Sequence, residues 1–514
     1  MSLVAADRAK TTPDDLAVTD GRLTLTWSEL DPFINRAANA LLGEGLGQPP
    51  RAAVFAHNSA ECALAYLALL RAGVSGVPAN FHLTADELAY ILEDSGARLL
   101  FVGPETADIG VQAARAAGID RVVGWRCAGV EGVTAWEDWL AAASDAPPPE
   151  TMPPLPYMHY TSGTTGRPKG TETPPSMFPR EADVTGLFRA LRELVEAAAP
   201  GPALLVGPNY HTGPLGSIRQ LAGGRPLVVL PRFDAEQILA AVEKHRVATM
   251  VMVPTHFQRL LALPDEVRGR YDVSSLQLVP HTGAACPVDV KRAMIAWWGP
   301  VFVDAYGATE AGTTNMITSE EWLLKPGSVG KPVPPLEMVV VAEDGTRLGA
   351  NAVGQLYFRD PSGRGIVYHN DPEKTAAAHI EPGVFTLGEI GYVDDDGYVF
   401  ITDRSSDMIV SGGVNIYPAE IEQVLITHPA VEDVAVIGVP NPDMGEEVKA
   451  LVVLRPGVGV TPAELGSYAR KRLARYKQPR SIDVVDTVGR NAMGKVNKRE
   501  LRRPFWPSDR TIGG

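Results

Sequence analysis

Residues 160–170 read YTSGTTGRPKG, and their types suit the binding of a polyphosphate. Glycines let the backbone turn so that consecutive N–H groups face inward and form a nest for anions. Hydroxyl side chains add hydrogen-bond donors, and a lysine adds a mobile positive charge. The residues of this type are Thr161, Ser162, Gly163, Thr164, Thr165 and Lys169. A polar loop without a ligand is the alternative, since Ser, Thr and Gly also cluster in ordinary loops.

A second group of chemically capable residues lies in YGATEAG, residues 306–312. The ring of Tyr306 can stack on a flat base, and the hydroxyl of Thr309 can reach a phosphate. The carboxylate of Glu310 can hold Mg²⁺ against phosphate oxygens. An expected strand, 302–305, ends just before this segment, and ligands of parallel sheets bind where strands end. The alternative is a turn with a core tyrosine and a solvated glutamate.

The elements that must position these residues alternate between strand and helix, which predicts a parallel sheet with helices on its faces. Helix 84–95 opens with Thr84 and has Glu87 three residues later, a capping-box pattern. The other expected helices are 27–46, 60–72 and 235–245, and the other expected strands are 52–55, 74–78, 99–102, 203–206 and 249–253. Segment 171–181 is rich in proline and polar residues and predicts an exposed loop.

The character of the chain changes after residue 333, where short β-rich runs with Asp-Gly turns begin. Beyond residue 403 follow helix 418–428, strands 431–439 and 447–454, and helix 462–473. This last stretch of about 110 residues is long enough to fold as its own domain. We therefore expect a multi-domain α/β protein.

Length and composition limit the number of domains, the partners and the location that we expect. A chain of 514 residues exceeds what one hydrophobic core supports. Its 47 basic and 61 acidic residues give a net charge of −14, so we expect neither nucleic acid nor a membrane as a partner. The longest apolar run, 62–70, is too short to cross a bilayer. Three widely spaced cysteines and an N-terminus unlike a signal peptide favour a cytoplasmic protein.

Four segments in this order resemble the ANL superfamily of adenylate-forming enzymes (the AMP-binding family), and best its acyl- and aryl-CoA synthetase branch. The segments are 160–170, 306–312, 385–422 and 489–501. The resemblance implies a large N-terminal adenylation domain, 1–403, with two sheet-and-helix halves of αβαβα type and a β-barrel-like subdomain. These parts would cover roughly 1–150, 151–332 and 333–403. A small, mobile α+β domain, 404–514, would act as a lid that carries Lys495.

The resemblance also implies nucleotide-binding roles, residue by residue. The residues that resemble the loop around the β- and γ-phosphates of ATP are Thr161, Ser162, Gly163, Thr164, Thr165 and Lys169. Those that resemble the adenine and ribose site are Gly283, Ala284, Ala285, Tyr306, Glu389 and Arg404. Thr309 resembles the α-phosphate ligand and Glu310 the Mg²⁺ ligand. Lys495 resembles the lysine that bridges the carboxylate and the α-phosphate.

Further residues resemble the parts that handle the acid and the thiol. Ser406 lies at the hinge of the lid, and Gly413 resembles the glycine that lets a thiol arm pass. His211 resembles the aromatic gate between the acyl pocket and the nucleotide. The residues expected to line that pocket are Tyr210, His211, Gly213, Gly216, Val253, Pro254, Thr255 and Gly283.

The implied chemistry explains why these residue types are needed. A carboxylate attacks the α-phosphate of ATP, expels pyrophosphate and becomes an acyl-adenylate, from which a thiol then displaces AMP. Both reactants of the first step are anions, so Mg²⁺ on Glu310 and the ammonium of Lys495 neutralise charge as they meet. Aligning the two substrates can supply roughly 7–11 kcal/mol of the barrier reduction. Movement of the lid then serves both half-reactions.

Three features depart from the family pattern. Glu389 stands where the family has Asp, and its side chain is one methylene longer. Ser406 stands where the hinge has Asp or Lys, although serine tolerates turn geometries. The sequence after Gly170 does not follow the usual continuation, and the role of 171–181 stays open.

The sequence leaves several alternatives for the carboxylic acid substrate and for the thiol acceptor. We expect a stand-alone carboxylate–CoA ligase that uses ATP, Mg²⁺ and coenzyme A, with a homodimer as a further possibility. A stand-alone enzyme that loads the phosphopantetheine of an acyl carrier protein is the alternative, and a degenerate regulatory member is a remote one. Gly213 and Gly216 leave room in the pocket, and no buried basic residue marks a partner for a second acidic group. These features favour a mid-sized or bulky apolar acid that is fatty, alicyclic or terpenoid-like.

Overall fold

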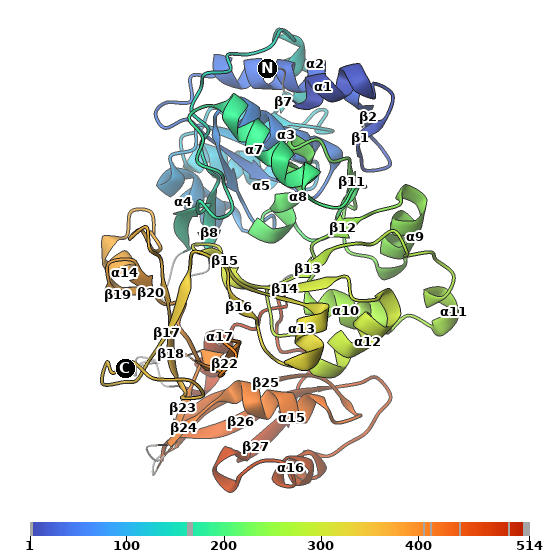
Figure 1. The fold of residues 1–514 in the computed structure, drawn as a ribbon. Helices are drawn as coiled ribbons and strands as arrows, with labels where there is room; N and C mark the ends of the chain where they lie inside the picture. The colour runs from blue at the N-terminus through green and yellow to red at the C-terminus, as the bar shows by residue number, and fades with distance from the viewer. Residues whose placement is uncertain are drawn as a thin grey trace. The chain divides into compact units, whose positions relative to one another are not determined.

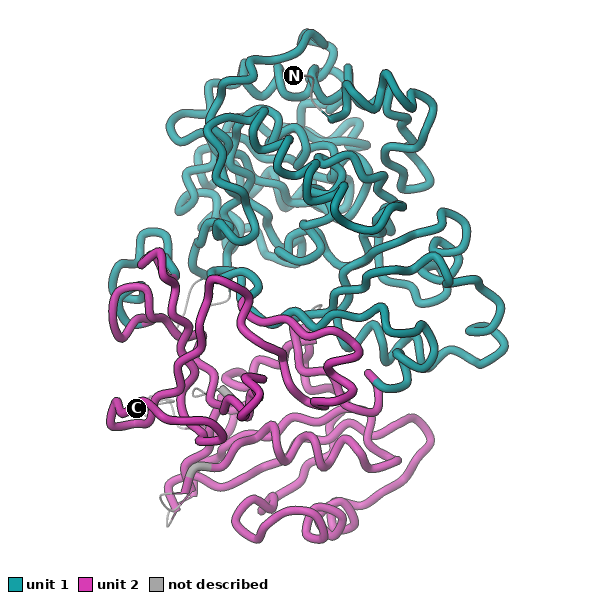
Figure 2. The backbone as a smooth tube through the Cα atoms, in the orientation of Figure 1, with its two compact units in different colours: residues 1–282, 292–313, 366–377 teal, residues 283–291, 314–365, 378–514 magenta. Residues whose placement is uncertain are grey.

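The structure is a computed structural model. It describes residues 4–161, 168–404, 407–411, 414–441, 444–491 and 494–506. At residues 403, 404 and 415 it describes the backbone alone. The chain forms two compact units, coloured separately in Figure 2. Unit 1 comprises residues 1–282, 292–313 and 366–377, and unit 2 comprises residues 283–291, 314–365 and 378–514. No helix in the described parts of the chain is long and apolar enough to cross a membrane.

The first sheet of unit 1 is parallel throughout and has the strand order β4-β3-β5-β6-β7. Its strands belong to the blue and cyan part of the ribbon in Figure 1. Its strands are β3 (Arg51–Phe55), β4 (Ser75–Pro78), β5 (Leu99–Val102), β6 (Arg121–Gly124) and β7 (Thr134–Ala135). The connecting helices are α3 (Ala60–Arg71), α4 (Ala85–Ser95) and α5 (Ala107–Ala116). The capping box predicted for α4 is confirmed, because Thr84 N donates to Glu87 Oε2 at 2.9 Å and Thr84 Oγ1 accepts from Glu87 N.

The second sheet of unit 1 has the order β12-β10-β11-β1-β2, and its last pair is antiparallel. Its strands are β1 (Leu16–Thr19), β2 (Thr24–Thr26), β10 (Ala203–Leu205), β11 (Leu227–Val229) and β12 (Thr249–Met250). Helices α7 (Val184–Glu196), α8 (Thr212–Ala222) and α9 (Ala235–His245) belong to this half. The strand predicted over 249–253 is shorter, because Val253 already caps α10 (Pro254–Leu261) and proline takes its first helical position.

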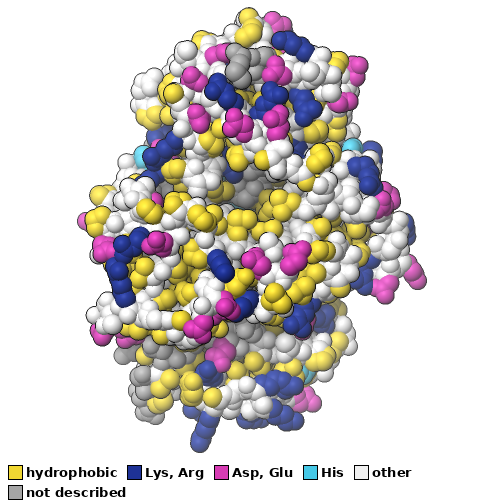
Figure 3. All heavy atoms as spheres, viewed as in Figure 1, with side chains coloured by type: hydrophobic (Ala, Val, Ile, Leu, Met, Phe, Trp, Pro, Cys, Tyr) yellow, Lys and Arg dark blue, Asp and Glu magenta, His cyan; other side chains and the backbone are white. Residues whose placement is uncertain are grey.

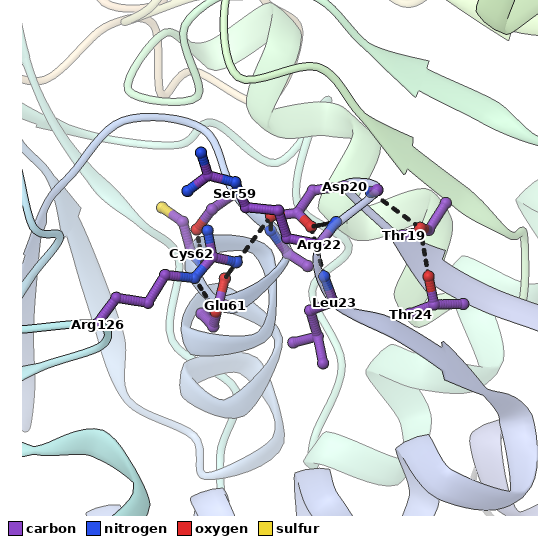
Figure 4. A network of polar contacts seen from close by, with 11 residues as sticks. Thr19, Asp20, Arg22, Leu23, Thr24, Ser59, Glu61, Cys62 and Arg126 are labelled. Atoms are coloured by element: carbon purple, nitrogen blue, oxygen red, sulfur yellow. Dashed lines mark hydrogen bonds and ion pairs between the residues drawn. The ribbon is translucent and has the colours of Figure 1, made fainter.

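Helices α2 (Trp27–Gly43), α3, α7 and α8 contribute side chains to one hydrophobic core. Every residue of α3 is buried, which fits its almost continuous apolar sequence. Polar contacts hold its first turn in place (Figure 4). Asp20 Oδ2 accepts from Ala60 N at 3.2 Å, and Ser59 Oγ accepts from Cys62 N at 3.1 Å. Arg126 binds Glu61 through two nitrogens at 2.8 Å, so the loop after β6 is tied to the start of α3.

Strands β8 (Met158–Thr161) and β9 (Lys169–Glu172) form an antiparallel hairpin in unit 1. The prediction that 171–181 is an exposed loop is wrong for its first half. Thr171 and Thr173 are buried, and the backbone N–H of Thr173 donates to the carbonyl of Tyr157 at 2.8 Å. Phe178 is buried as well. Hydroxyls bonded to the backbone allow threonines to sit inside, so the polar composition did not mean exposure.

Strand β14 (Phe302–Ala308) pairs in parallel with β13 (Val279–His281). It is longer than the predicted strand, so Tyr306 and Gly307 lie within it and not beyond its end. A turn of Thr309, Glu310 and Ala311 leads into β15 (Gly312–Thr318). A side chain at Gly307 would collide with the carbonyl of Gly312. The two glycines therefore allow a close approach that leaves Thr309 and Glu310 at the tip.

Unit 2 contains an antiparallel sheet with the order β19-β20-β18-β21-β22, and β17 also pairs with β18. Its strands are β17 (Glu337–Val341), β18 (Gly354–Arg359), β19 (His379–Glu381), β20 (Val384–Phe385), β21 (Glu389–Val393) and β22 (Val399–Arg404). A small core forms around Val340, Leu356 and Val399.

A second sheet of unit 2 has the order β24-β23-β26-β25, and β27 pairs in parallel with β26. Its elements are β23 (Ile409–Ser411), β24 (Val414–Ile416), α15 (Pro418–Ile426), β25 (Val431–Asn441), β26 (Gly445–Leu454), α16 (Pro462–Arg470), β27 (Ser481–Val484) and α17 (Lys498–Arg502). Alternate residues of β25 face two different cores, one shared with α15 and α16 and the other with Leu501 of α17. The predicted helices and strands of this region are confirmed within a few residues, and the domain boundary at residue 404 stays a prediction.

The surface carries charges of both signs. On the face drawn in Figure 3, basic and acidic side chains are interspersed with apolar ones. A polyanionic ligand must therefore be recognised by a local group of cations rather than by the net charge of −14.

Candidate active site

The β8–β9 hairpin carries the described ends of the predicted phosphate loop. Thr161, the last residue of β8, and Lys169, the first residue of β9, are register partners. The other predicted loop residues, Ser162, Gly163, Thr164 and Thr165, lie outside the described residues. The hairpin thus fixes where the loop begins and where Lys169 follows it.

Hydrogen bonds to neighbouring segments fix the position of this hairpin. The hydroxyl of Tyr160 donates to Asp94 Oδ2 at 2.7 Å, and burial together with Asp94 raises the pKa of Tyr160. The backbone N–H of His369 donates to the carbonyl of Gly170 at 2.7 Å. Thr171 Oγ1 donates to the carbonyl of Val367 at 3.0 Å. These bonds place the segment around residues 366–371 alongside β9.

Lys169 forms an ion pair in this arrangement. Its Nζ lies 2.9 Å from Asp371 Oδ2, and the hydrogen bond to Asp371 raises the pKa of the lysine. Asp371 also accepts from the backbone N–H of Lys374 at 3.0 Å, at the start of α14 (Pro372–Ala377). Hydrogen bonds from Lys374 and Lys169 lower the pKa of Asp371. Lys169 is therefore charged, and a third of its side chain is exposed.

Glu310 has a defined partner at the tip of the β14–β15 turn. The hydroxyl of Tyr368 donates to Glu310 Oε1 at 2.7 Å. Burial and the adjacent Glu310 raise the pKa of Tyr368, so its hydroxyl remains a donor. Lys374 Nζ lies 4.0 Å from the centroid of the Tyr368 ring. Burial lowers the pKa of Lys374, while Glu310 and Asp371 oppose that effect.

Three members of this cluster, Tyr368, Asp371 and Lys374, were not predicted from the sequence. Their segment reads YHNDPEKT, in which Asp371 before Pro372 signals the start of a helix. That signal predicts a helix but does not indicate a chemical role for these residues. Their role becomes visible only when β9 and the turn at Glu310 are seen to meet the same segment.

Thr309 and His211 are also brought near each other. Thr212 Oγ1 donates to Thr309 Oγ1 at 3.4 Å, which joins the turn to the first residue of α8. His211 is the N-cap residue of α8, and its ring lies 4.3 Å from that of Tyr210. Tyr210 in turn meets Phe81 edge-on at 5.1 Å. An aromatic group therefore lies at the start of α8.

The predicted acyl-pocket residues of unit 1 are distributed over α8 and α10. An added Cβ at Gly213 would lie 3.3 Å from Val251, so α8 passes close to the chain that leads to Val253 and Pro254. Val253 and Pro254 are buried, whereas Thr255 is partly exposed. Arg219 of α8 is partly exposed, and desolvation by the surrounding protein lowers its pKa. The expectation that no buried basic residue marks a partner for a second acidic group stays a prediction.

Other predicted nucleotide-binding residues belong to unit 2. Gly283, Ala284 and Ala285 follow β13, and Gly283 has φ +93°, which favours glycine. Glu389 is buried at the start of β21 and is the register partner of Arg404 on β22. The structure thus brings the two predicted ribose residues opposite each other on neighbouring strands.

Lys495 lies in a tight turn before α17. Its backbone N–H donates to Asn491 Oδ1 at 3.0 Å, and its carbonyl accepts from Asn491 N at 2.9 Å. Val496 beside it packs into the core under β25, which leaves Lys495 exposed. Ser406 and Gly413 lie outside the described residues.

Fold and site together define a two-unit α/β protein that gathers lysines and carboxylates around the ends of a glycine-rich loop. Family models agree with this class: the model described as AMP-binding enzyme matches residues 5–365, and that of the AMP-binding enzyme C-terminal domain matches residues 420–495. The chain belongs to the AMP-binding enzyme family, within the ANL superfamily.

Relatives cover the chain from end to end. A fatty acid–[acyl-carrier-protein] ligase, ScoC, of Streptomyces coeruleorubidus is 33% identical over 98% of this chain and 95% of its own. A feruloyl-CoA synthase of an Amycolatopsis species is 36% identical over 97% of each chain. The crystal structure of ATP-bound MatB from Rhodopseudomonas palustris superimposes with a TM-score of 0.81 at 29% identity, covering 98% of both chains.

These comparisons confirm several predictions. The family assignment and the fold class, an α/β protein with a large N-terminal and a smaller C-terminal domain, are confirmed. So is the enzyme class, an AMP-forming acid–thiol ligase. The site residues taken one by one, and the domain boundaries, stay predictions.

Proposed function

We propose that this protein is an ATP-dependent carboxylate–CoA ligase. It activates a carboxylic acid as an acyl-adenylate with release of pyrophosphate, and it then transfers the acyl group to the thiol of coenzyme A with release of AMP. The relative named as a feruloyl-CoA synthase supports coenzyme A as the acceptor. The likeness to ATP-bound MatB supports ATP as the nucleotide.

One observation carries the proposal, namely the two linked pairs beside the loop ends. Lys169 is paired with Asp371, and Glu310 is bonded to Tyr368. Asp371 and Tyr368 belong to one short segment, so the cation and the carboxylate that a nucleoside triphosphate needs are held by the same piece of chain. Such prearrangement lowers the cost of organising charges when the triphosphate binds.

The residues present fit a bound magnesium ion. Glu310 offers one partly exposed carboxylate that is already oriented by Tyr368. No group of three or more potential ligands was found among the described residues. Mg²⁺ in such sites takes one or two protein carboxylates and completes its shell with phosphate oxygens and water. When bound, it would neutralise phosphate charge.

The chain's own residues then divide the remaining work. Lys169 would bind the outer phosphates in exchange for Asp371, and Thr309 would donate to the α-phosphate. His211 and Tyr210 would separate the acid from the nucleotide and exclude water. Lys495 would place its ammonium between carboxylate and α-phosphate in the first half-reaction. No protein nucleophile is needed, because the reaction depends on alignment and charge.

The proposal also specifies the thiol acceptor and the class of carboxylic acid. Coenzyme A is favoured, and a carrier protein is the second candidate because ScoC is named as a ligase for one. We propose a mid-sized or bulky acid with a largely apolar body, since Gly213 and Gly216 withhold side chains from the pocket. We further propose that the protein works in the cytoplasm, and a homodimer is compatible with this function.

Pyrophosphate release tests the proposal directly. The purified protein is incubated with ATP, Mg²⁺ and a panel of fatty, alicyclic and arylpropenoic acids, with and without coenzyme A. Release that depends on acid, and a thioester that forms only with coenzyme A, is the expected result. Acid-dependent release without thioester, followed by labelling of a phosphopantetheine carrier, would favour the second acceptor. Absence of release with every acid would contradict the proposal.

A further inference from the structure

Segment 173–178 directly follows β9, and the proposed reaction has so far given it no part. Its first residue is buried, and the backbone N–H of that residue donates to the carbonyl of Tyr157 at 2.8 Å. The backbone N–H groups of Met177 and Phe178 donate to the carbonyl of Pro174 at 2.9 and 3.0 Å, which closes a β-turn. Phe178 is buried in the hydrophobic core to which α7 and α8 contribute. Both ends of the segment are therefore anchored in unit 1.

This segment packs against the turn that carries Glu310. Gly312 follows that turn and has φ +76°, which favours glycine. Three atoms of the segment would lie 3.1 Å or less from a Cβ at Gly312, namely Ser176 Oγ at 2.5 Å, Met177 Cγ at 3.0 Å and Pro174 Cγ at 3.1 Å. Ser176 Oγ also donates to the carbonyl of Ala311 at 3.4 Å. Glycine is thus required here by the backbone conformation and by the neighbouring segment together.

The segment links two parts of the candidate site. Because it continues β9, it connects the turn at Glu310 to the strand that begins with Lys169. The hydroxyl of Tyr368 supports the same turn by donating to Glu310 Oε1 at 2.7 Å. Tyr368 gives the carboxylate its direction, whereas the segment limits where the backbone of the turn can lie. All of these residues belong to unit 1.

We propose that segment 173–178 is a positioning element, which sets the place of the Glu310 turn relative to Lys169. This inference rests on the proposed ligase function and adds a determinant of Mg²⁺ and ATP binding to it. The segment acts through its contact with Gly312 and touches neither substrate. A displaced turn would move the carboxylate of Glu310 away from the ion, and it would leave the binding of the carboxylic acid unchanged.

Gly312→Ala tests this assignment. The added methyl group forces the segment or the turn to shift by a few tenths of an ångström. A misplacement of about 1 Å can cost about 100-fold, so we expect this smaller shift to raise the Mg²⁺ concentration for half-maximal pyrophosphate release, and the KM for ATP, about tenfold. The KM for the acid should stay as in the wild type. A purely structural role would not separate these constants.

Gly299→Ala is the matched control. Gly299 also belongs to unit 1 and has φ +83°, and an added Cβ there meets no atom within 4 Å. Both substitutions put alanine in the left-handed region and should lower the melting temperature by a similar amount. Only Gly312→Ala should raise the Mg²⁺ requirement, and adding Ser176→Ala to it should restore part of the loss. Equal Mg²⁺ requirements in the two single alanine variants, or no recovery in the double variant, would overturn the proposal.

A second perturbation covers the case in which Gly312→Ala does not fold. Combining Ser176→Ala with Met177→Ala removes two of the three contacts with the turn and adds no atom. We expect this variant to fold and to need more Mg²⁺ than the wild type, because the turn loses its support. An unchanged Mg²⁺ requirement would contradict the positioning role.

Nucleotide binding gives a readout that does not depend on activity. The shift in melting temperature caused by a non-hydrolysable ATP analogue is measured with and without Mg²⁺ for the wild type, Gly312→Ala and Gly299→Ala. The part of the shift that depends on Mg²⁺ should be smaller in Gly312→Ala than in Gly299→Ala. Should the wild type release no pyrophosphate with any acid, the ligase function fails and this measurement alone decides the inference. Equal shifts in both variants, or no Mg²⁺-dependent shift in the wild type, would refute it.

Discussion

Replacing Tyr368 by phenylalanine isolates the bond that orients the proposed magnesium ligand. The substitution keeps the ring under Lys374 and removes the hydroxyl that donates to Glu310 at 2.7 Å. Because Glu310 is partly exposed, water can solvate its carboxylate in the variant. We therefore expect the fold to persist and the carboxylate to lose its fixed direction.

The size of the effect follows from the kind of bond. A hydrogen bond to a charged group contributes roughly 1.5–3 kcal/mol, and partial exposure favours the lower end. A loss of about 1.4 kcal/mol corresponds to a factor of about ten. We expect kcat/KM for ATP in pyrophosphate release to fall about tenfold, and higher Mg²⁺ to restore part of it.

The assay separates the two half-reactions. Acyl-adenylate formation is followed by pyrophosphate release, and thioester formation is followed from a supplied acyl-adenylate and coenzyme A. The matched control is Tyr398→Phe in unit 2. Tyr398 also donates to a glutamate, Glu321, at 3.2 Å and also has a lysine on its ring, Lys331 at 4.5 Å. Only Tyr368→Phe should slow the first half-reaction, and neither should slow the second.

Two results would refute this reasoning. If both variants slowed adenylation equally, the effect would reflect general destabilisation and not the orientation of Glu310. If Tyr368→Phe left kcat/KM for ATP unchanged at limiting Mg²⁺, the Tyr368–Glu310 bond would have no part in nucleotide binding. Melting temperatures of both variants accompany the kinetics.

Further predictions concern the other charged residues. Lys495→Ala should slow pyrophosphate release by at least 100-fold and leave thioester formation from supplied acyl-adenylate largely intact, and equal loss in both assays would contradict its role. Glu389→Asp should hold or improve the KM for ATP, so a severe increase would show that the ribose site depends on the longer side chain. Asp371 has a lowered pKa, so its pair with Lys169 should be complete above pH 3.8 and be lost only as the pH falls below that value. Replacing Asp371 by asparagine should therefore leave the shape of the rate profile between pH 5 and 8 unchanged, and a new acid-side limb there would contradict the assignment.

Much of the fold could be predicted from periodicity and capping alone. The helix at 84–95 and the strand at 99–102 were placed within a residue, because an amphipathic repeat, a capping box and a short apolar run are local signals. The C-terminal helices and strands followed for the same reason. Strand 249–253 was extended too far, since the bend into α10 depends on packing around Pro254.

The site was only partly predictable, because its partners are distant in sequence. Glu310 and Lys169 belong to recognisable motifs, whereas Tyr368 and Asp371 gain a role only from tertiary contacts.

The charge arrangement around the loop ends bears on how the proposed triphosphate site would be stable before the triphosphate binds. Lys169 and Lys374 are balanced by Asp371 and Glu310, so the cluster has no net charge when these four groups are ionised. Under the proposed function, a triphosphate with its magnesium ion would replace Asp371 at Lys169 and place phosphate oxygens near Glu310. In that arrangement Asp371 would keep its hydrogen bond from the backbone N–H of Lys374, so the displaced carboxylate would still have a donor.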